Sequence, residues 1–285
     1  MPGLAALPRP RGRHLDQIAI YGKGGIGKSA IATNLTARYA LAGERVLHVG
    51  CDPKVDSAVR LLDDRRLVTV MDLSGDGSAD VPFSAIVNRG RHGVDCVEAG
   101  GPEPGTGCAG RGVARTIEII GESGVLERDA YDTVVFDVLG DVVCGGFASP
   151  LRLGFARKVV IVISDQPMSL FAANNITKAI HRYAANGVAL AGLVANSMSE
   201  TTNRDLLVRF AAALGTRILA FVPRDPALPD AENRRFTVTE AAPDSPAARA
   251  IAGLAETLRA LDVTSLPLPR TLSEDDFFKF VQGAG

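Results

Sequence analysis

The feature that most constrains the fold is a glycine-rich stretch that directly follows an apolar run. Residues 22–29 read GKGGIGKS, a complete match to the pattern GxxxxGK[ST], and they come immediately after the run Ile18 to Tyr21. A helical stretch, Ser29 to Ala42, comes next. In this setting the glycines let successive backbone N–H groups converge on phosphate oxygens, and the helix N-terminus adds the positive end of its dipole. The sequence therefore predicts a P-loop and a chain that binds ATP or GTP.

The side chains of this loop have distinct expected roles. Lys28 would neutralise the β- and γ-phosphates, and Ser29 would ligate Mg²⁺. Lys23 is a second lysine that the loop does not need for its own phosphates. The KGGxGK form resembles the deviant Walker A ATPases, in which that lysine reaches the nucleotide of a facing subunit; the simpler interpretation is a lysine that faces solvent. The expected nucleotide-binding residues of the loop are Gly22, Lys23, Gly24, Gly25, Ile26, Gly27, Lys28 and Ser29.

The rest of the chain alternates apolar runs with helical stretches. Runs without polar alternation are typical of strands buried on both faces. Five more of them are Val46 to Val49, Thr133 to Phe136, Val159 to Ile163, Leu190 to Ala195 and Ile218 to Val222. Helical stretches include Met168 to Ala185, Thr201 to Leu214 and Pro246 to Leu261. We therefore predict one α/β P-loop NTPase domain, residues 17–285, with a mostly parallel sheet covered by helices on both faces, after a flexible extension, residues 1–16.

Composition excludes several kinds of partner. The 285 residues carry a formal net charge of −1, so no overall basic field exists to hold nucleic acid or an anionic membrane. No apolar run reaches the length of roughly 18 to 20 residues that a membrane span needs. Four cysteines in a chain of this size do not form the dense disulfide framework of a small secreted domain. We expect a cytoplasmic protein without a nucleic-acid or membrane partner.

Three aspartates follow predicted strands. Asp52 and Asp56 lie in CDPKVDS, after the second strand, where a carboxylate can reach the attacking water and the Mg²⁺ shell of a bound nucleotide. Asp137 begins DVLG, the pattern of a Walker B carboxylate followed by a hinge glycine, Gly140. An alternative for the loop aspartates is helix capping.

Two of the four cysteines lie in glycine-rich stretches. Cys108 lies in GGPEPGTGCAGRG, and Cys144 lies in GDVVCGG, just beyond Asp137. A helix is expected to begin near Gly112 or Val113, with its positive end toward Cys108. Backbone of this kind can approach closely and offer N–H donors to an anionic group, which suits an iron–sulfur cluster.

The number of such cysteines indicates how a cluster would be completed. A [4Fe–4S] cluster requires four thiolates, and one chain supplies two, Cys108 and Cys144. Two copies related by a twofold axis would supply one full set, which predicts a cluster at a homodimer interface. A catalytic thiol or inert buried cysteines are the alternatives. Cys51 and Cys96 are expected to be small buried residues.

Several longer strings resemble one family. YGKGGIGKS, VGCDPKVDS, CVEAGGPEPGTGCAGRG, DVLGDVVCGGFA, AANNITK and FVPRD occur in the order and spacing of the nitrogenase iron protein (dinitrogenase reductase) and its nitrogenase-like relatives. The resemblance covers about Gln17 to Val281. It implies a homodimer bridged by one [4Fe–4S] cluster, with MgATP as the second cofactor.

The resemblance also implies roles for individual residues. Asp52 would promote hydrolysis, Lys23 would act across the dimer, and Asp56 and Asp137 would lie in the two nucleotide switches. Cys108 and Cys144 would ligate the shared cluster. The remaining implied residues are Asn196 and the turn Pro223, Arg224 and Asp225, which would frame the adenine, and Arg111, which matches an arginine that is ADP-ribosylated in some iron proteins.

The function implied is ATP-dependent electron transfer. Such a protein takes electrons from ferredoxin or flavodoxin and passes them one at a time to a heteromeric metallocluster protein, the nitrogenase-like catalytic component. Relatives of this kind serve dinitrogen reduction, methylthio-alkane reduction, and protochlorophyllide or chlorophyllide reduction.

Departures from the family pattern favour one of these systems. The residues after Cys108 are nitrogenase-like, whereas tetrapyrrole reductases usually have a second glycine there. Leu151 to Phe155 lacks the acidic and lysine residues expected of the docking helix, Gly121 to Ser123 is poor in glutamate, and Ala30 replaces the usual threonine. Docking charge chiefly sets partner choice. We therefore favour a methylthio-alkane reductase system over nitrogenase, with a tetrapyrrole reductase third.

Two functions of other classes fit part of the sequence. A non-redox ATPase switch of the ParA/MinD kind would share Lys23 and Lys28 but would need neither Cys108 nor Cys144. A P-loop kinase or small-molecule synthetase would need a substrate-binding insertion or a basic lid, and the sequence shows neither.

Overall fold

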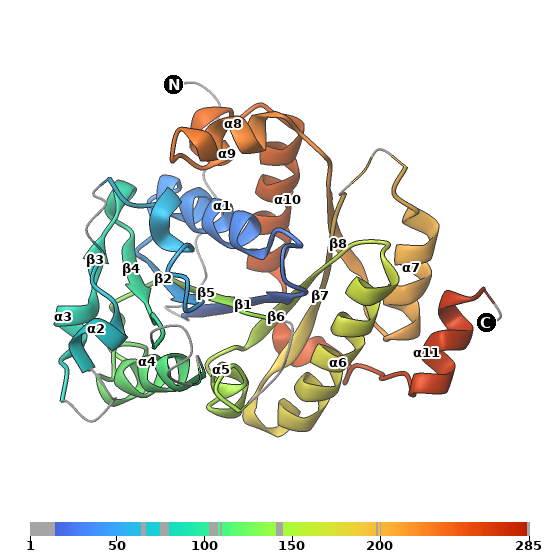
Figure 1. The fold of residues 1–285 in the computed structure, drawn as a ribbon, viewed down its shortest axis with the longest axis horizontal. Coiled ribbons are helices and arrows are strands. Elements are labelled where there is room, and N and C mark those ends of the chain that lie inside the picture. The colour runs from blue at the N-terminus through green and yellow to red at the C-terminus, as the bar shows by residue number, and fades with distance from the viewer. Residues whose placement is uncertain are drawn as a thin grey trace.

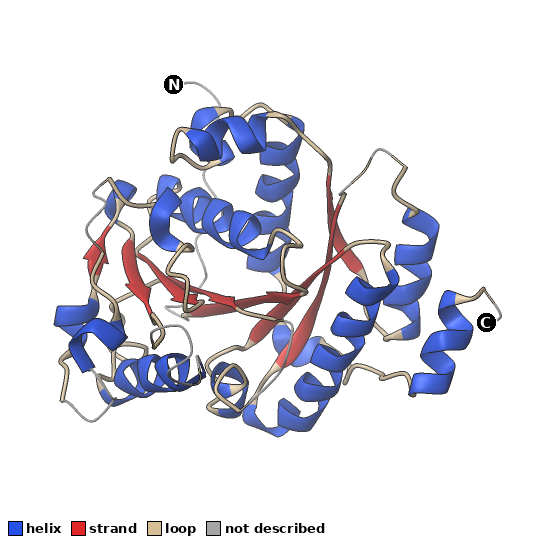
Figure 2. Cartoon of the chain, in the orientation of Figure 1, coloured by secondary structure: helices blue, strands red, loops and turns tan. Residues whose placement is uncertain are grey.

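An eight-stranded sheet crosses the molecule in the order β3-β4-β2-β5-β1-β6-β7-β8 (Figures 1 and 2). The computed structural model describes residues 15–63, 67–74, 80–102, 108, 110–140, 145–197, 199 and 201–283. Every strand pair is parallel except the edge pair β3 and β4. The strands are β1 (Asp16–Gly22), β2 (Val46–Cys51), β3 (Asn88–Arg89), β4 (Asp95–Glu98), β5 (Thr133–Val138), β6 (Lys158–Ile163), β7 (Ala189–Asn196) and β8 (Ile218–Val222). The predicted α/β fold class is confirmed.

Helices cover both faces of the sheet (Figure 1). One face is covered by α1 (Lys28–Leu41), α8 (Ala227–Asn233), α9 (Val238–Ala241) and α10 (Pro246–Ala260). The other face is covered by α2 (Val70–Ser74), α3 (Phe83–Ile86), α4 (Gly110–Glu122), α5 (Ser149–Arg152), α6 (Pro167–Tyr183), α7 (Arg204–Ala213) and α11 (Glu274–Val281). Short 3₁₀ turns lie at Ala58–Arg60 (η1), Arg91–Gly93 (η2), Ala184–Asn186 (η3) and Val263–Ser265 (η4).

Two hydrophobic cores explain why the strands lack polar alternation. Successive side chains of a strand point to opposite faces. Ile18 and Ile20 of β1 therefore join the core under α1 and α10, whereas Ala19 and Tyr21 join the core under α4 and α6. Each central strand must be apolar on both sides, because both sides are covered.

Most predicted elements are present within a few residues of their expected ends. The six predicted strands and the four long predicted helices all form, but the edge strand β3 and its neighbour β4 were not among the predicted strands. The sequence of β4, DCVE, is short and begins and ends with an acid, so it lacks the pattern of a buried strand. The helix expected near Gly112 begins two residues earlier, at Gly110. The predicted N-terminal extension lies almost wholly outside the described residues and stays a prediction.

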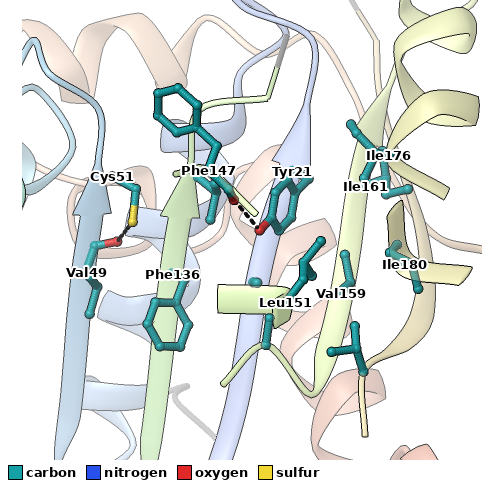
Figure 3. Packing of buried hydrophobic residues seen from close by; sticks show 14 of the residues in the cluster. Tyr21, Val49, Cys51, Phe136, Phe147, Leu151, Val159, Ile161, Ile176 and Ile180 are labelled. Carbon is teal, nitrogen blue, oxygen red and sulfur yellow. Dashed lines mark hydrogen bonds between the residues drawn. The ribbon is translucent and has the colours of Figure 1, made fainter. Parts of the chain in front are cut away.

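The segment after the second glycine-rich stretch is anchored to the centre of the sheet (Figure 3). The Tyr21 hydroxyl donates a hydrogen bond of 3.1 Å to the Phe147 carbonyl, and both residues are buried. Leu151 of α5 packs in the same core, together with Val159 and Ile161 of β6. Burial raises the pKa of Tyr21, so the phenol stays a neutral donor. The chain that leaves β5 is thereby held against β1.

A buried ionic cluster ties together the amino ends of the central strands. Asp16, at the start of β1, pairs with Lys158 of β6 at 2.8 Å and with Arg259 of α10 at 3.2 Å. Arg259 also pairs with Glu44 and donates to the Thr133 hydroxyl at 2.9 Å. The Arg259 side chain is 4% exposed.

No helix in the described ranges is long and apolar enough to cross a bilayer.

Removing Arg259 should destabilise the domain. Arg259→Met leaves the Glu44 carboxylate, whose side chain is only 11% exposed, without its cation, and removing one partner of a buried pair costs about 3–5 kcal/mol. The matched control is Arg45→Met, because Arg45 pairs with Asp129 and Asp132 but its side chain is 50% exposed; its loss should cost less than about 1 kcal/mol. The free energy of unfolding from urea titration measures both. Equal losses would contradict the role assigned to the cluster.

Candidate nucleotide and cluster site

Three functional loops meet because of the strand order. β5 lies between β1 and β2, and Asp137 of β5 is in register with Ile20 of β1 and with Gly50 of β2. The strands are parallel, so their carboxyl ends lie at one edge of the sheet. That edge, where the strand order reverses, is the usual ligand site of an open α/β sheet. The P-loop, the Asp52 loop and Asp137 are therefore brought together, as the sequence predicts.

The loop between β1 and α1 wraps around its own lysine. Lys28 is 7% exposed, and its ammonium donates a hydrogen bond of 3.1 Å to the Lys23 carbonyl. Ser29, the next residue, hydrogen-bonds the Asp137 carboxylate. A buried ammonium, a helix N-terminus and a serine beside a buried carboxylate are the parts with which P-loop proteins hold Mg²⁺ and nucleoside triphosphate. The residues present thus fit MgATP.

Asp137 lies at the bottom of this site and is 3% exposed. Burial raises the pKa of Asp137, while hydrogen bonds from Ser29 and Ser57 and the charge of Lys28 oppose the rise. The Ser57 hydroxyl lies 2.6 Å from Asp137 Oδ2. The carboxylate is therefore held in place by two hydroxyl donors, one from the P-loop helix and one from the Asp52 loop.

The two loop aspartates have different surroundings. Asp52 is half-buried, and its Oδ1 accepts a hydrogen bond of 2.9 Å from the Lys54 amide, whereas Asp56 is exposed. Val55 between them has φ = 57°. A β-branched residue in the left-handed region is strained, and such strain is concentrated at switch segments and ligand sites. The response of this loop to the nucleotide stays a prediction, and the strain at Val55 supports it.

Gly140 brings the end of β5 into backbone contact with the P-loop. A Cβ atom on Gly140 would lie 2.0 Å from the carbonyl oxygen of Gly22. Contacts below about 3 Å cannot be accommodated when the neighbour is backbone, so only glycine fits here. The predicted hinge glycine thus touches the first residue of the P-loop.

Cys108 lies two residues before the start of α4, beside the segment that follows the second candidate cysteine. Cys108 is exposed, and its carbonyl accepts a hydrogen bond of 3.1 Å from the Arg111 amide. A Cβ atom on Gly146 would lie 2.1 Å from the Gly110 carbonyl oxygen, so backbone on the C-terminal side of Cys144 rests on this helix start. Cys144 itself lies outside the described residues. An exposed thiol at a helix N-terminus, with the second stretch alongside, fits part of a [4Fe–4S] site.

The other described cysteines are of a different kind. Cys51 and Cys96 are both buried, as predicted, and burial raises the pKa of each thiol. Among the described residues, no three His, Cys, Asp or Glu side chains come together as a metal site. The ligand roles of Cys108 and Cys144 therefore stay a prediction.

Comparison with known families identifies the group to which the chain is related. The family described as "4Fe-4S iron sulfur cluster binding proteins, NifH/frxC family" matches residues 16–284. The chain belongs to this family. The match covers β1 through α11 and includes every described candidate residue of the NifH/frxC site.

Solved structures of other P-loop proteins share the fold of this NifH/frxC family member. MinD of Pyrococcus horikoshii OT3, complexed with Mg-ADP, is 20% identical, with 85% of this chain and 94% of that chain covered and a TM-score of 0.68. A ParA family ATPase from Chlorobium tepidum TLS is 19% identical, with 86% and 98% covered and a TM-score of 0.63. Cobyrinic acid a,c-diamide synthase from Mycobacterium smegmatis, with an ATP analog and magnesium, is 20% identical, with 91% and 99% covered and a TM-score of 0.63.

Two of the residues predicted to frame adenine have structural partners in this NifH/frxC chain. Asn196, at the end of β7, donates a hydrogen bond of 2.8 Å to the Ile26 carbonyl in the P-loop. Asp225 accepts hydrogen bonds from the Ala227 amide at 3.0 Å and the Ala247 amide at 2.9 Å. Burial alone would raise the pKa of Asp225, but these hydrogen bonds outweigh burial and lower the pKa. Asn196 thus holds the backbone of the P-loop, and Asp225 holds the backbone at the starts of α8 and α10. The contact of these two residues with adenine stays a prediction.

Other predicted residues lie where a partner could reach them. Arg224 is exposed and Pro223 half-buried at the end of β8. Lys23 is half-buried in the P-loop, and Arg111 is exposed on the first turn of α4. The roles of Lys23 across a dimer and of Arg111 in modification stay predictions.

Three residues of the site were missed from the sequence. Ser57 ends the quoted CDPKVDS string, and His48 interrupts the apolar run of β2; both are fully buried. Glu98, at the end of β4, is also fully buried; its Oε1 accepts a hydrogen bond of 2.6 Å from the Ala58 amide. Burial raises the pKa of Glu98 to about 8, although that hydrogen bond opposes the rise. For His48 the signal available was a polar residue within an apolar run that must be buried on both faces.

Gly140→Ala should strongly weaken nucleotide binding. The added methyl group would have to displace the Gly22 backbone, which begins the P-loop, and overpacking of this kind costs about 1–3 kcal/mol or more, equivalent to roughly 5- to 150-fold in Kd. Gly253→Ala is the matched control, because a Cβ atom there meets nothing within 4 Å. Isothermal titration with MgATP measures the Kd of each variant. Unchanged binding by Gly140→Ala would show that the contact does not shape the site.

Proposed function

We propose that this protein is an ATP-dependent iron–sulfur reductase that works as a homodimer. The observation that carries the proposal is the way in which the segment bearing Cys144 is attached. Its first residue, Gly140, packs on Gly22 of the P-loop, and Gly146 beyond Cys144 packs on Gly110 beside Cys108. The stretch between these two backbone contacts thus joins the nucleotide loop to the helix start that carries the other candidate ligand.

The chain's own residues have separable roles in this function. Lys28, Ser29 and Asp137 would hold MgATP, Asp52 would promote hydrolysis, and Lys23 would reach the nucleotide across the dimer. Cys108 and Cys144 from each of two chains would hold one [4Fe–4S] cluster. The cluster, when bound, supplies one-electron redox chemistry. Closure of the dimer on ATP would shift the segment from Gly140 to Gly146, so that nucleotide state sets when an electron can leave.

The electron acceptor in this proposal is a nitrogenase-like catalytic component. Ferredoxin or flavodoxin would supply the electrons. The uncommon docking residues Leu151 to Phe155 favour a methylthio-alkane reductase system. Nitrogenase itself and the protochlorophyllide or chlorophyllide reductases are the alternatives. Anaerobic co-purification of the partner, followed by assays with dinitrogen, methylthio compounds and protochlorophyllide, distinguishes the three.

A second function is favoured by the shared fold. The MinD and ParA structures have the same architecture, and a non-redox ATPase switch would need the P-loop lysines but no cluster. Such a switch does not need an exposed thiol beside a helix N-terminus, as at Cys108, and we therefore favour the reductase.

Loss of either ligand cysteine should abolish the cluster. Protein purified anaerobically should be brown and contain about four iron atoms per dimer, and Cys108→Ala or Cys144→Ala should be colourless while still binding MgATP. Cys96→Ala is the control, because this buried thiol lies in β4 and should leave the iron content unchanged. Iron analysis and visible absorption measure the result. A colourless wild-type protein that binds MgATP would instead support the ATPase switch.

Asp137→Asn should uncouple the nucleotide from the cluster. In the wild type, MgATP is expected to change the rate at which an iron chelator removes iron, because Asp137 and Gly140 are joined to the segment that bears Cys144. The neutral amide cannot replace the carboxylate beside Ser29, so MgATP should leave the chelation rate of the variant unchanged. A wild-type response in Asp137→Asn would contradict the proposed coupling.

A further inference from the structure

A chain of buried hydrogen bonds ends on the Asp137 carboxylate. Ser57 Oγ lies 2.6 Å from Asp137 Oδ2, His48 Nε2 lies 2.8 Å from Ser57 Oγ, and Thr36 Oγ1 lies 2.9 Å from His48 Nδ1. Thr36, His48 and Ser57 are fully buried, and Asp137 is 3% exposed. The roles assigned above to the nucleotide site use neither Thr36 nor His48.

The donors and acceptors of this chain follow from counting hydrogens. A hydroxyl carries one hydrogen, and Ser57 gives its hydrogen to the carboxylate of Asp137. Ser57 must then accept from His48 Nε2, so the imidazole hydrogen lies on Nε2 and Nδ1 accepts from the Thr36 hydroxyl. Burial lowers the pKa of His48 to about 3, which keeps the ring neutral with a single hydrogen. Every hydrogen therefore points from Thr36 toward Asp137.

Both ends of this chain of hydrogen bonds lie at the same helix, α1. Thr36 is on α1, and Ser29, which also hydrogen-bonds Asp137, is in the first turn of α1. The two residues are about two helical turns apart. The path Thr36, His48, Ser57, Asp137 and Ser29 is thus a closed ring that braces the carboxylate against the P-loop helix.

A histidine is costly at this point of β2. Val46 lies in the core under α1, and Leu47 and Val49 lie in the opposite core. A buried imidazole destabilises the fold unless both ring nitrogens are hydrogen-bonded. An apolar side chain at the same position would carry no such desolvation penalty. Both nitrogens are paired here, and the pairing reaches the site through Ser57, which ends the loop of Asp52 and Asp56.

We propose that His48 is a positioning residue for the Mg²⁺ part of the nucleotide site. Its Nε2–H fixes the Ser57 hydroxyl, and the hydroxyl fixes the orientation of the Asp137 carboxylate beside Ser29. The inference rests on Mg²⁺ binding near Ser29 and Asp137 in the proposed function, but it is independent of the cluster and of any redox partner.

The tautomer of His48 gives the first test. In protein labelled with ¹⁵N-histidine, the four histidines give resolved ring signals, and loss of one signal in His48→Gln assigns His48. We expect the Nε2–H tautomer in nucleotide-free wild-type protein at neutral pH. An Nδ1–H tautomer would require Ser57 to give its one hydrogen to His48 Nε2 instead of to Asp137, and would overturn the proposal.

The Mg²⁺ dependence of ATP binding gives the second test. His48→Leu removes the donor to Ser57, so we expect the Kd for MgATP to rise about three- to tenfold, the effect of one lost hydrogen bond. The Kd for ATP in EDTA should change less than about twofold, because the phosphate-binding backbone is untouched. His48→Gln, whose amide N–H can still reach Ser57, should restore most of the wild-type MgATP affinity.

A matched histidine variant separates this role from general destabilisation. His181 of α6 bonds the Pro269 carbonyl at 3.2 Å, and His181→Leu should change neither Kd. Equal weakening of both ATP forms in His48→Leu, or no weakening of either, would overturn the proposal. If His48→Leu does not fold, the tautomer of the wild type still decides. Failure of the wild type to bind ATP, with or without Mg²⁺, would instead overturn the proposed function. The tautomer of His48 would still show whether its Nε2–H donates to Ser57.

Discussion

The site depends on close approach between backbone segments that belong to different strands. Gly140 at the end of β5 touches the first residue of the P-loop, and Gly146 touches the first residue of α4. A Cβ atom would lie 2.0 Å from the Gly22 carbonyl oxygen in the first case and 2.1 Å from the Gly110 carbonyl oxygen in the second, so a side chain at either position would force the segments apart. These two contacts bring into one neighbourhood a phosphate loop, a buried carboxylate and an exposed thiol. The arrangement of β5 between β1 and β2 supplies the rest, because it orders the three loops along one sheet edge.

The local parts of this arrangement could be predicted from the sequence. The P-loop depends on residues that are adjacent in the chain, so a pattern of eight residues was sufficient to place it between β1 and α1. The central strands were equally clear, since burial on both faces leaves apolar runs. Asp137 was found because it ends such a run. The family match over residues 16–284 agrees with the longer strings.

The parts that depend on distant residues could not be predicted in the same way. Ser57 and Asp137 are far apart in the chain, and the partner of a buried serine cannot be read from its neighbours. The start of α4 was placed too late because glycine usually marks a helix end. Gly112 lies within this helix for a tertiary reason: a Cβ atom there would lie 2.6 Å from the Gly100 carbonyl oxygen, where β4 leads into the Cys108 stretch. The position of Cys144 relative to Cys108 lies beyond what the described residues include.

The ionic cluster around Arg259 gives the sheet two unlike ends. Asp16, Glu44, Thr133 and Lys158 all lie at or just before the amino ends of β1, β2, β5 and β6, and one guanidinium connects three of them. The opposite ends of β1, β2 and β5 carry the glycine contacts and the strained Val55. In the proposed function, the nucleotide would therefore act on loops at one end of these strands, while the ionic cluster holds the other end fixed. Changes at the phosphates would then be expressed as shifts of the loops that follow β1, β2 and β5 rather than as movement of the strands themselves.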